Sequence, residues 1–374
     1  MQQPPPAIPG MREDEVDTPA LLIDLDAFEH NLDLMAKIAR EGGIKLRPHA
    51  KTHKSPVIAH QQIARGAVGQ CVQKVSEAEI LAWGGVANIL VSNQVVGASK
   101  LARFAALSRI ADIAICADHI VQIEAIEAAA EAANTRLRLL LEIDVGMERC
   151  GVTPGPEAVA LCQRIAGSRH LIFGGLQAYH GRAQHKRSFA ERQTAITRAA
   201  ELTAQTIDGL RKVGLDCAIV GGGGTGSYEF EIASGVYTEL QAGSYCFMDA
   251  DYGRNLDRSG APISSFRQSL FVLATVMSRP SRNMAVIDAG LKAFAVDSGL
   301  PLAWQRPDIQ FISAADEHGK LDLSSETTAP LLGEKLRFVP GHCDPTVDRY
   351  DWYVGIRNGR VECLWPVAAR GAAT

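Results

Sequence analysis

The sequence predicts an α/β protein with an N-terminal (β/α)8 TIM-type barrel and a C-terminal antiparallel β domain. Two observations predict this class. Between residues 44 and 245, eight short apolar runs alternate with longer amphipathic stretches, and after about residue 262 short strand-like runs alternate with turn signals. The chain of 374 residues is long enough for both parts. We therefore expect an N-terminal arm and a strand that joins the β domain in residues 1–25, the barrel in 26–261 and the β domain in 262–374.

The barrel strands are expected at the eight apolar runs, which are 44–46, 67–72, 88–91, 112–116, 137–143, 171–178, 217–220 and 238–242. The helix candidates between them are 55–65, 76–83, 99–108, 121–133, 156–166 and 189–213. Such alternation is typical of parallel strands joined by helical crossovers. Eight units favour a closed barrel, and a doubly wound open sheet is the alternative.

The C-terminal third has the pattern of an antiparallel β domain. Its strand-like runs are 270–276, 284–287, 309–313, 335–339, 351–357 and 361–366. Asn358-Gly359 separates the last two runs, and this dipeptide suits the positive φ angles of a tight hairpin turn. The early apolar run 20–24 precedes the barrel, so we expect it to join the β domain.

Composition argues against several partners and compartments. A formal net charge of -4 gives no electrostatic basis for binding nucleic acid or an anionic membrane. No apolar run approaches the length of a membrane span. Residues 1–10 are rich in Gln and Pro without the pattern of a signal peptide, so we expect a loose arm. The eight cysteines are scattered without a CxxC pair, which favours reduced thiols in the cytoplasm.

Polar, titratable or glycine-rich segments follow most of the expected barrel strands. Barrel enzymes place their sites at the C-terminal ends of the strands, so these segments should converge on one rim. They are 49–51 after the first strand, 73–74 after the second, 144–149 after the fifth, 179–180 and 184–185 after the sixth, 221–226 after the seventh and 243–245 after the eighth.

The glycine run 221–226 is a candidate phosphate site. Glycines such as Gly223 and Gly224 allow backbone N–H groups to approach an anion, and Thr225 adds a hydroxyl. In these barrels the loops after strands seven and eight often bind phosphate, which also brings in Gly243 and Ser244. No Gly-Lys-Ser/Thr follows, so the run is not a P-loop. Taken alone, four glycines are as typical of a flexible turn.

Lys51 is a candidate for covalent attachment of a cofactor. It follows the first strand in a basic cluster with His49, His53 and Lys54. Neighbouring cations and partial burial lower the pKa of a lysine, so we expect a lowered pKa and an amine available for imine chemistry. The alternative is a solvated surface turn. A lysine imine together with a phosphate site is how pyridoxal 5'-phosphate is held, and this favours the cofactor.

His342 and Asp344 are candidate metal ligands. If their segment is extended, both side chains point to one face and Cys343 points to the other. One nitrogen and one oxygen ligand suit Mn, Mg, Co or Zn, and two ligands leave room for water and substrate. On spacing alone, a surface turn is the more common explanation of such a pair.

Longer motifs carry a resemblance that covers nearly the whole chain. They are Gln73-Lys74-Val75-Ser76-Glu77-Ala78-Glu79, Gly222-Gly223-Gly224-Thr225-Gly226-Ser227-Tyr228, Phe247-Met248-Asp249-Ala250-Asp251-Tyr252-Gly253-Arg254, Asp288-Ala289-Gly290-Leu291-Lys292 and Pro340-Gly341-His342-Cys343-Asp344-Pro345-Thr346. With these the chain resembles the fold type III, alanine racemase-like pyridoxal phosphate enzymes. Within them it resembles the branch of D-threonine aldolase and D-serine dehydratase, with particular similarity to the 3-hydroxy-D-aspartate aldolases.

The resemblance implies a homodimer whose site is completed at the interface, and it implies roles for single residues. Lys51 would hold the cofactor, and His342 and Asp344 would bind a divalent metal. His185 matches the family's base better than His180. The positions that match or lie near cofactor-contacting ones are Gln73, Arg149, Tyr179, Gly223, Gly224, Thr225, Gln241, Gly243, Ser244 and Tyr252.

The activity that the resemblance implies is retro-aldol cleavage of a D-3-hydroxy amino acid, dependent on pyridoxal phosphate and on Mn, Mg or Co. 3-Hydroxy-D-aspartate would give glycine and glyoxylate, and D-threonine would give glycine and acetaldehyde. The alternative is a D-serine or D-3-hydroxyaspartate dehydratase, but the family's dehydratases pair the metal histidine with a Cys two residues later, where this chain has Asp344. A non-catalytic pyridoxal phosphate carrier would lack the second domain.

Overall fold

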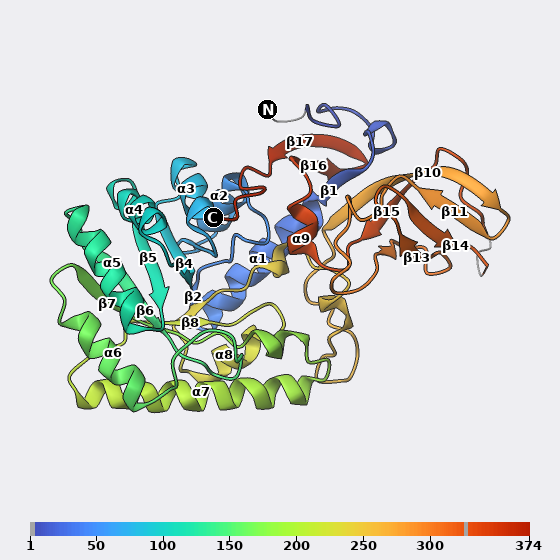
Figure 1. Cartoon of the computed structure of the whole chain (residues 1–374). Helices are drawn as coiled ribbons and strands as arrows, with labels where there is room; N and C mark the ends of the chain where they lie inside the picture. Colours follow the sequence, from blue (N-terminus) through green and yellow to red (C-terminus); the bar gives the residue numbers. More distant parts are fainter. Residues whose placement is uncertain (1–3, 325–327) are drawn as a thin grey trace.

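The computed structural model describes residues 4–324 and 328–374, which fold around two β-sheets (Figure 1). One sheet is parallel and forms the barrel, and the other is mostly antiparallel. The predicted α/β class, with a barrel followed by a β domain, is therefore confirmed.

The barrel sheet has eight parallel strands in the order β2-β9-β8-β7-β6-β5-β4-β3. Its strands are β2 (Lys45–Leu46), β3 (Gln70–Val72), β4 (Asn88–Gln94), β5 (Asp112–Ala117), β6 (Leu137–Glu142), β7 (Leu171–Gln177), β8 (Ile219–Gly222) and β9 (Glu239–Leu240). Backbone hydrogen bonds join its two edges, because Val68 N donates to Leu46 O and Ala50 N donates to Cys71 O. These bonds close the curled sheet, so the open doubly wound alternative is wrong.

Helices cover the outside of the barrel. They are α1 (Leu25–Glu41), α2 (Pro56–Ala64), α3 (Val75–Trp83), α4 (Ala98–Ala106), α5 (Ile120–Ala132), α6 (Pro156–Ala166), α7 (Phe189–Lys212) and α8 (Tyr228–Ser234), with short 3-10 helices at η2 (Leu107–Arg109), η3 (Gly181–His185), η4 (Ser244–Cys246) and η5 (Tyr252–Arg254). The apolar strands alternate between two packing environments. Ile89 and Val91 of β4 belong to the large core, whereas Leu90 packs with Cys116 and Leu140 in a smaller cluster. This two-residue period is that of a strand buried on both faces.

The second sheet contains nine strands, which are β1 (Ala20–Asp24), β10 (Leu270–Ser281), β11 (Met284–Ile287), β12 (Leu302–Ala303), β13 (Gln310–Ala314), β14 (Gly319–Asp322), β15 (Lys335–Val339), β16 (Trp352–Arg357) and β17 (Arg360–Pro366). As expected, the early strand β1 joins this sheet, antiparallel to β10 and parallel to β16. The hairpin between β16 and β17 is confirmed, with φ of 50° at Asn358 and 71° at Gly359. In Figure 1 the short helix α9 (Cys343–Val347) lies where the orange and red strands meet the barrel.

The N-terminal segment does not form the expected loose arm over the residues that the structure describes. Gly10 N donates to Val361 O, and Asp17 N donates to Pro6 O. Ala7 is buried with Val16 in a cluster on the β domain, next to η1 (Glu13–Glu15). Residues 1–3 lie outside the described part. Among residues 4–324 and 328–374, no helix combines the length and the apolar character needed to cross a membrane.

Candidate active site

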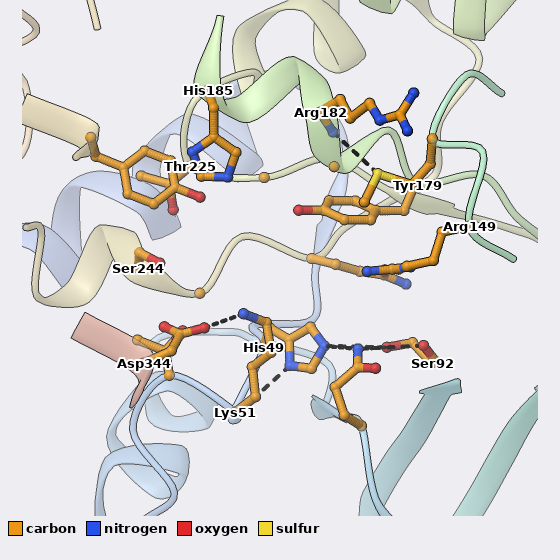
Figure 2. A pocket seen from close by; sticks show the side chains of 18 of the residues that line it. His49, Lys51, Ser92, Arg149, Tyr179, Arg182, His185, Thr225, Ser244 and Asp344 are labelled. Carbon is orange, nitrogen blue, oxygen red and sulfur yellow. Dashed lines mark hydrogen bonds and ion pairs between the residues drawn. The ribbon is translucent and has the colours of Figure 1, made fainter. Parts of the chain in front are cut away.

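The site is a cavity of about 410 Å³ at the C-terminal ends of the barrel strands, beside α9. Every residue predicted for the site lines it except Gly223. Figure 2 shows Lys51, His49 and Asp344 on one side of the cavity and His185, Tyr179 and Arg182 on the other. The lining residues are His49, Lys51, Thr52, Gln73, Ser92, Glu142, Met147, Arg149, Gln177, Tyr179, Gly181, Arg182, His185, Gly224, Thr225, Gln241, Gly243, Ser244, Tyr252, His342 and Asp344.

Lys51 reaches the cavity from the turn after β2, and its Nζ forms an ion pair with Asp344 Oδ2. The expected lowering of its pKa is wrong. Burial opposes the charged amine, but the negative charge of Asp344, assisted by Tyr179, outweighs burial and raises the pKa of Lys51. The same pairing, with His342 nearby, holds the pKa of Asp344 below its usual range although burial acts in the opposite direction. Both groups are therefore charged at neutral pH.

His342 and Asp344 reach the same cavity, but not through an extended segment. Asp344 lies in the first turn of α9, and His342 immediately precedes that helix. Cys343 between them is buried, and its backbone N donates to Asp249 Oδ2 at 2.9 Å. His342 Nδ1 contacts Asp297 Oδ2 at 2.8 Å, which leaves Nε2 as the nitrogen that could face a cation. The expected shared orientation is thus produced by a helix start and not by strand alternation.

The chemistry of this donor pair fits a divalent cation, as an imidazole nitrogen and a carboxylate oxygen are ordinary ligands of such ions. Among residues 4–324 and 328–374, no group of three or more His, Cys, Asp and Glu side chains could hold a metal ion. A cation at His342 and Asp344 would therefore take its remaining ligands from water or substrate, as in an open catalytic site.

The predicted phosphate loop presents Gly224 and Thr225 to the cavity. Thr225 Oγ1 is buried and has no hydrogen-bond partner within the described residues, so its hydroxyl is available to a ligand. Gly223 lies behind this loop, where an added Cβ would meet Leu240 at 2.9 Å and Glu231 at 3.4 Å. Gly223 is therefore not part of the cavity's lining, and its contact with the cofactor stays a prediction.

The loop after β9 completes this wall of the cavity. At Gly243 the backbone passes so close to the turn that contains Lys51 that an added Cβ would lie 2.6 Å from Thr52 Oγ1 and 2.8 Å from His49 O. Ser244 begins the 3-10 helix η4 and also lines the cavity. The loops after β8 and β9 therefore form a cradle with hydroxyl and backbone groups, which suits a phosphate.

His185, and not His180, faces the cavity. His185 ends η3, and its Nδ1 lies 2.6 Å from Asp251 Oδ2, with the Tyr252 ring 6.2 Å away between centroids. His180 is buried beside Gly146, and it is absent from the cavity lining. A base drawn from these two histidines would therefore be His185.

The lining includes His49 from the predicted rim segment 49–51, and also Glu142 and Gln177, which the sequence does not predict. His49 is buried, which lowers its pKa well below the usual value, and its Nε2 lies 2.8 Å from the side-chain amide of Gln73. Glu142 and Gln177 are the last residues of β6 and β7. Both stand at the end of a strand, which is the signal that could identify them, whereas the predicted rim consists only of residues that follow each strand.

The lining of the cavity also contains a neutral amide pair and a buried acid. Gln177 Nε2 donates to Gln241 Oε1 at 2.7 Å, and Gln241 Nε2 donates to Gln177 Oε1 at 2.8 Å. Glu142 accepts from Gln94 Nε2 at 2.6 Å, and burial raises the pKa of Glu142 to about 7. The predicted residue Gln241 thus contributes a paired, uncharged amide to the site.

Comparison with known proteins agrees with this geometry. The family described as alanine racemase, N-terminal domain, matches residues 23–251. The chain belongs to this alanine racemase-like family. A second family, the putative serine dehydratase domain, matches residues 269–356. Members of the alanine racemase-like family use pyridoxal phosphate, and the amine of Lys51, the unpartnered Thr225 hydroxyl and the glycine cradle fit that cofactor.

Individual relatives are similar over almost their full length. A 3-hydroxy-D-aspartate aldolase from Paracoccus denitrificans (strain Pd 1222) is 46% identical, with 98% of this chain and 95% of the relative covered. A D-threonine aldolase from Arthrobacter sp is 45% identical, with 98% of this chain and 96% of the relative covered. The crystal structure of D-threonine aldolase from Filomicrobium marinum is 48% identical and covers 100% of both chains with a TM-score of 0.97. A D-threo-3-hydroxyaspartate dehydratase from Delftia sp. (strain HT23) is more distant, at 28% identity over 90% of this chain and 93% of the relative.

Proposed function

We propose that the protein is a lyase that cleaves D-3-hydroxy amino acids between Cα and Cβ, with pyridoxal phosphate and a divalent cation. 3-Hydroxy-D-aspartate gives glycine and glyoxylate, and D-threonine gives glycine and acetaldehyde. The observation that carries the proposal is that Lys51 and the His342–Asp344 pair line one cavity. The relatives with 45–46% identity, which are aldolases of these substrates, support the same reaction.

The cofactor would be held by residues from several barrel loops. Lys51 would anchor it covalently, and Thr225 with the backbone at Gly224 and Gly243 would bind its phosphate. The remaining contacts would come from Gln73, Arg149, Tyr179, Gln241, Ser244 and Tyr252, all of which line the cavity. Bound pyridoxal phosphate supplies an electron sink for the electron pair that remains on Cα when the Cα–Cβ bond breaks.

A second group of lining residues would act on the 3-hydroxyl group. His342 and Asp344 would hold Mn, Mg or Co, which supplies a Lewis acid at that hydroxyl. His185 is the base that accepts the hydroxyl proton. Loss of this proton lets the oxygen form the aldehyde carbonyl as Cα–Cβ breaks, and Cα then takes up a proton to give glycine. The half-exposed ring of His185 can exchange its proton with solvent for the next turnover.

A dehydratase is the second candidate, since the family matching residues 269–356 is described as a putative serine dehydratase domain. Product analysis separates the two reactions. Purified protein with Mn or Mg, or with chelator, is incubated with D-threonine, both D-3-hydroxyaspartate diastereomers and D-serine. Glycine plus an aldehyde supports the aldolase, whereas a keto acid plus ammonia as the main products would replace it with the dehydratase. The Lys51→Ala variant serves as the control for cofactor-dependent turnover.

We also propose a cytoplasmic homodimer, with residues 26–261 as the barrel domain and 262–374 as the β domain. The eight free cysteines support a reducing compartment. The two family matches, which end at residue 251 and begin at residue 269, lie on either side of the proposed boundary. Light scattering of the purified protein would test the dimer, and a monomeric mass at working concentration would contradict it.

A further inference from the structure

His185 is held from behind by a buried carboxylate. Its Nδ1 lies 2.6 Å from Oδ2 of Asp251, and the His185 side chain is 51% exposed whereas that of Asp251 is 5% exposed. The two residues are 66 positions apart in the chain. Asp251 belongs to the segment between η4 and β10 that leads out of the barrel. The ring therefore faces the cavity while its rear nitrogen is fixed by a group from another loop.

Asp251 is itself fixed by two arginines. Its Oδ1 accepts hydrogen bonds from Arg254 Nη2 at 2.6 Å and from Arg187 Nη2, so the two carboxylate oxygens have separate tasks. Burial favours the neutral acid, but hydrogen bonds from His185, Arg187 and Arg254 outweigh burial and lower the pKa of Asp251. The carboxylate is therefore ionised and has little rotational freedom.

This arrangement has a consequence for proton transfer. A carboxylate at Nδ1 keeps a proton on that nitrogen, so Nε2 carries the lone pair that can accept a proton. When Nε2 accepts the proton, the ring becomes an imidazolium next to an ionised carboxylate, which stabilises the new positive charge. The geometry thus selects both the tautomer and the orientation of a base.

We propose that Asp251 is a positioning residue that directs Nε2 of His185 toward the reacting hydroxyl and stabilises the protonated ring. This inference rests on the proposed function, in which His185 is the base. Asp251 does not line the cavity, and it acts on the substrate only through His185. The competing explanation is structural, in which Asp251 serves only to neutralise Arg187 and Arg254 and to attach their loops.

The chain offers a matched control for the structural explanation. Arg254→Met removes one ion pair of Asp251 and the hydrogen bond from Arg254 Nη2 to Ser298 O, while the contact between Asp251 and His185 stays. Arg254 does not line the cavity. If Asp251 were only a structural clamp, Asp251→Asn and Arg254→Met would lower thermal stability and turnover together.

The experiment compares holoenzyme variants in steady-state cleavage of D-threonine and 3-hydroxy-D-aspartate. Asparagine can donate to Nδ1 and so stabilise the wrong tautomer, and we expect Asp251→Asn to lower kcat by about 100-fold or more. KM should change less than about threefold, because substrate-binding groups are intact. The visible absorbance of the cofactor and the bound metal should not change. Asp251→Glu should recover part of kcat, and Arg254→Met should lower kcat less than Asp251→Asn does, because Arg187 still holds Oδ1 of Asp251.

A double variant gives the decisive result. If Asp251 acts through His185, then Asp251→Asn adds no further loss of kcat in a His185→Ala background. An equal further loss in that background would overturn the proposal, as would a kcat for Asp251→Asn equal to that of Arg254→Met. If the wild-type products are a keto acid and ammonia, the proposed aldolase activity is wrong. The comparison of Asp251→Asn in the wild-type and His185→Ala backgrounds, made on that dehydratase reaction, then still tests the role of Asp251. If Asp251→Asn does not fold, Asp251→Glu in both backgrounds provides the cycle.

Discussion

Replacement of Glu231 by Gln should change how the protein's stability depends on pH. Glu231 lies on α8 behind the phosphate loop and is 1% exposed. Its Oε1 accepts from Ser227 Oγ at 2.8 Å, and its Oε2 is buried with no hydrogen-bond partner in the part of the chain that the structure describes. Burial is the largest effect on this carboxyl and raises the pKa of Glu231 to about 7. A glutamine would keep the hydrogen bond from Ser227 without a charge to bury.

The size and sign of the effect follow from proton linkage. The ordinary pKa is 4.5 and the folded value is about 7, so the folded chain keeps a proton that the unfolded chain loses across this window. The contribution of the Glu231 carboxyl to the free energy of unfolding is fully present below pH 4.5 and is lost as the pH rises through 7. At about 1.4 kcal/mol for each pKa unit, the free energy of unfolding falls by up to about 3 kcal/mol. Glu231→Gln lacks this loss.

Urea unfolding of the cofactor-free proteins at pH 5 and pH 8 measures the effect. The free energy of unfolding of Glu231→Gln minus that of wild type should be about 2–3 kcal/mol larger at pH 8 than at pH 5. Other titrating groups are the same in both proteins, so their effects cancel in this comparison. Glu201→Gln is the control, because the Glu201 side chain is 55% exposed and water already hydrates its carboxylate. A difference that is equal at both pH values would refute the reasoning.

Four further predictions concern the cavity. Lys51→Ala should abolish the visible absorbance of the bound cofactor and glycine release, and either one surviving would contradict the anchor. In cofactor-free protein the same substitution should raise the affinity for Mn²⁺, followed by electron paramagnetic resonance, by about 5–150-fold, since a competing ammonium is removed. Chelation should stop glycine release, and added Mn²⁺ should restore it. His342→Ala should lower the affinity for the metal by more than roughly 10–100-fold, which is the usual effect of removing a hydrogen-bond partner of a metal ligand. Gly243→Ala should weaken cofactor binding, measured by fluorescence titration, because its Cβ would lie 2.8 Å from His49 O, while Gly253→Ala, with no atom within 4 Å, should not.

The barrel could be predicted because its signal is local and repeated. Each of the eight parallel strands is a short apolar run between amphipathic stretches, and every one of the eight runs overlaps a strand of the barrel sheet. The helices α1 and α8 were missed. Helix α8 has only seven residues, and it follows the glycine run, which reads as a turn. Strands β12 and β14 were also missed, since β12 has only two residues and the four residues of β14, Gly-Lys-Leu-Asp, contain a single large apolar side chain.

Much of the site could also be predicted, because the topology of a parallel barrel brings all strand ends to one rim. This rule placed Gln73, Thr225 and Ser244 at the cavity before any contact was known. It does not tell which of the adjacent residues in a glycine run face the cavity, and of Gly223 and Gly224 only Gly224 lines it. It also could not place Asp251, because that contact joins two irregular segments whose paths no periodic pattern describes.

The sign of the pKa shift at Lys51 shows where local reasoning stops. Its sequence neighbours are cations and the turn is buried, and both features lower the pKa of an amine. The carboxylate that reverses the sign is 293 positions away, on a helix that follows the other sheet. A cation held by Asp344 would compete with the ammonium of Lys51 for that carboxylate, so attachment of the cofactor to Lys51 would remove the competitor. By linkage, a cation bound there would favour cofactor attachment by the same factor. We therefore expect the junction of the two sheets to make the loading of the cofactor and of the metal cooperative.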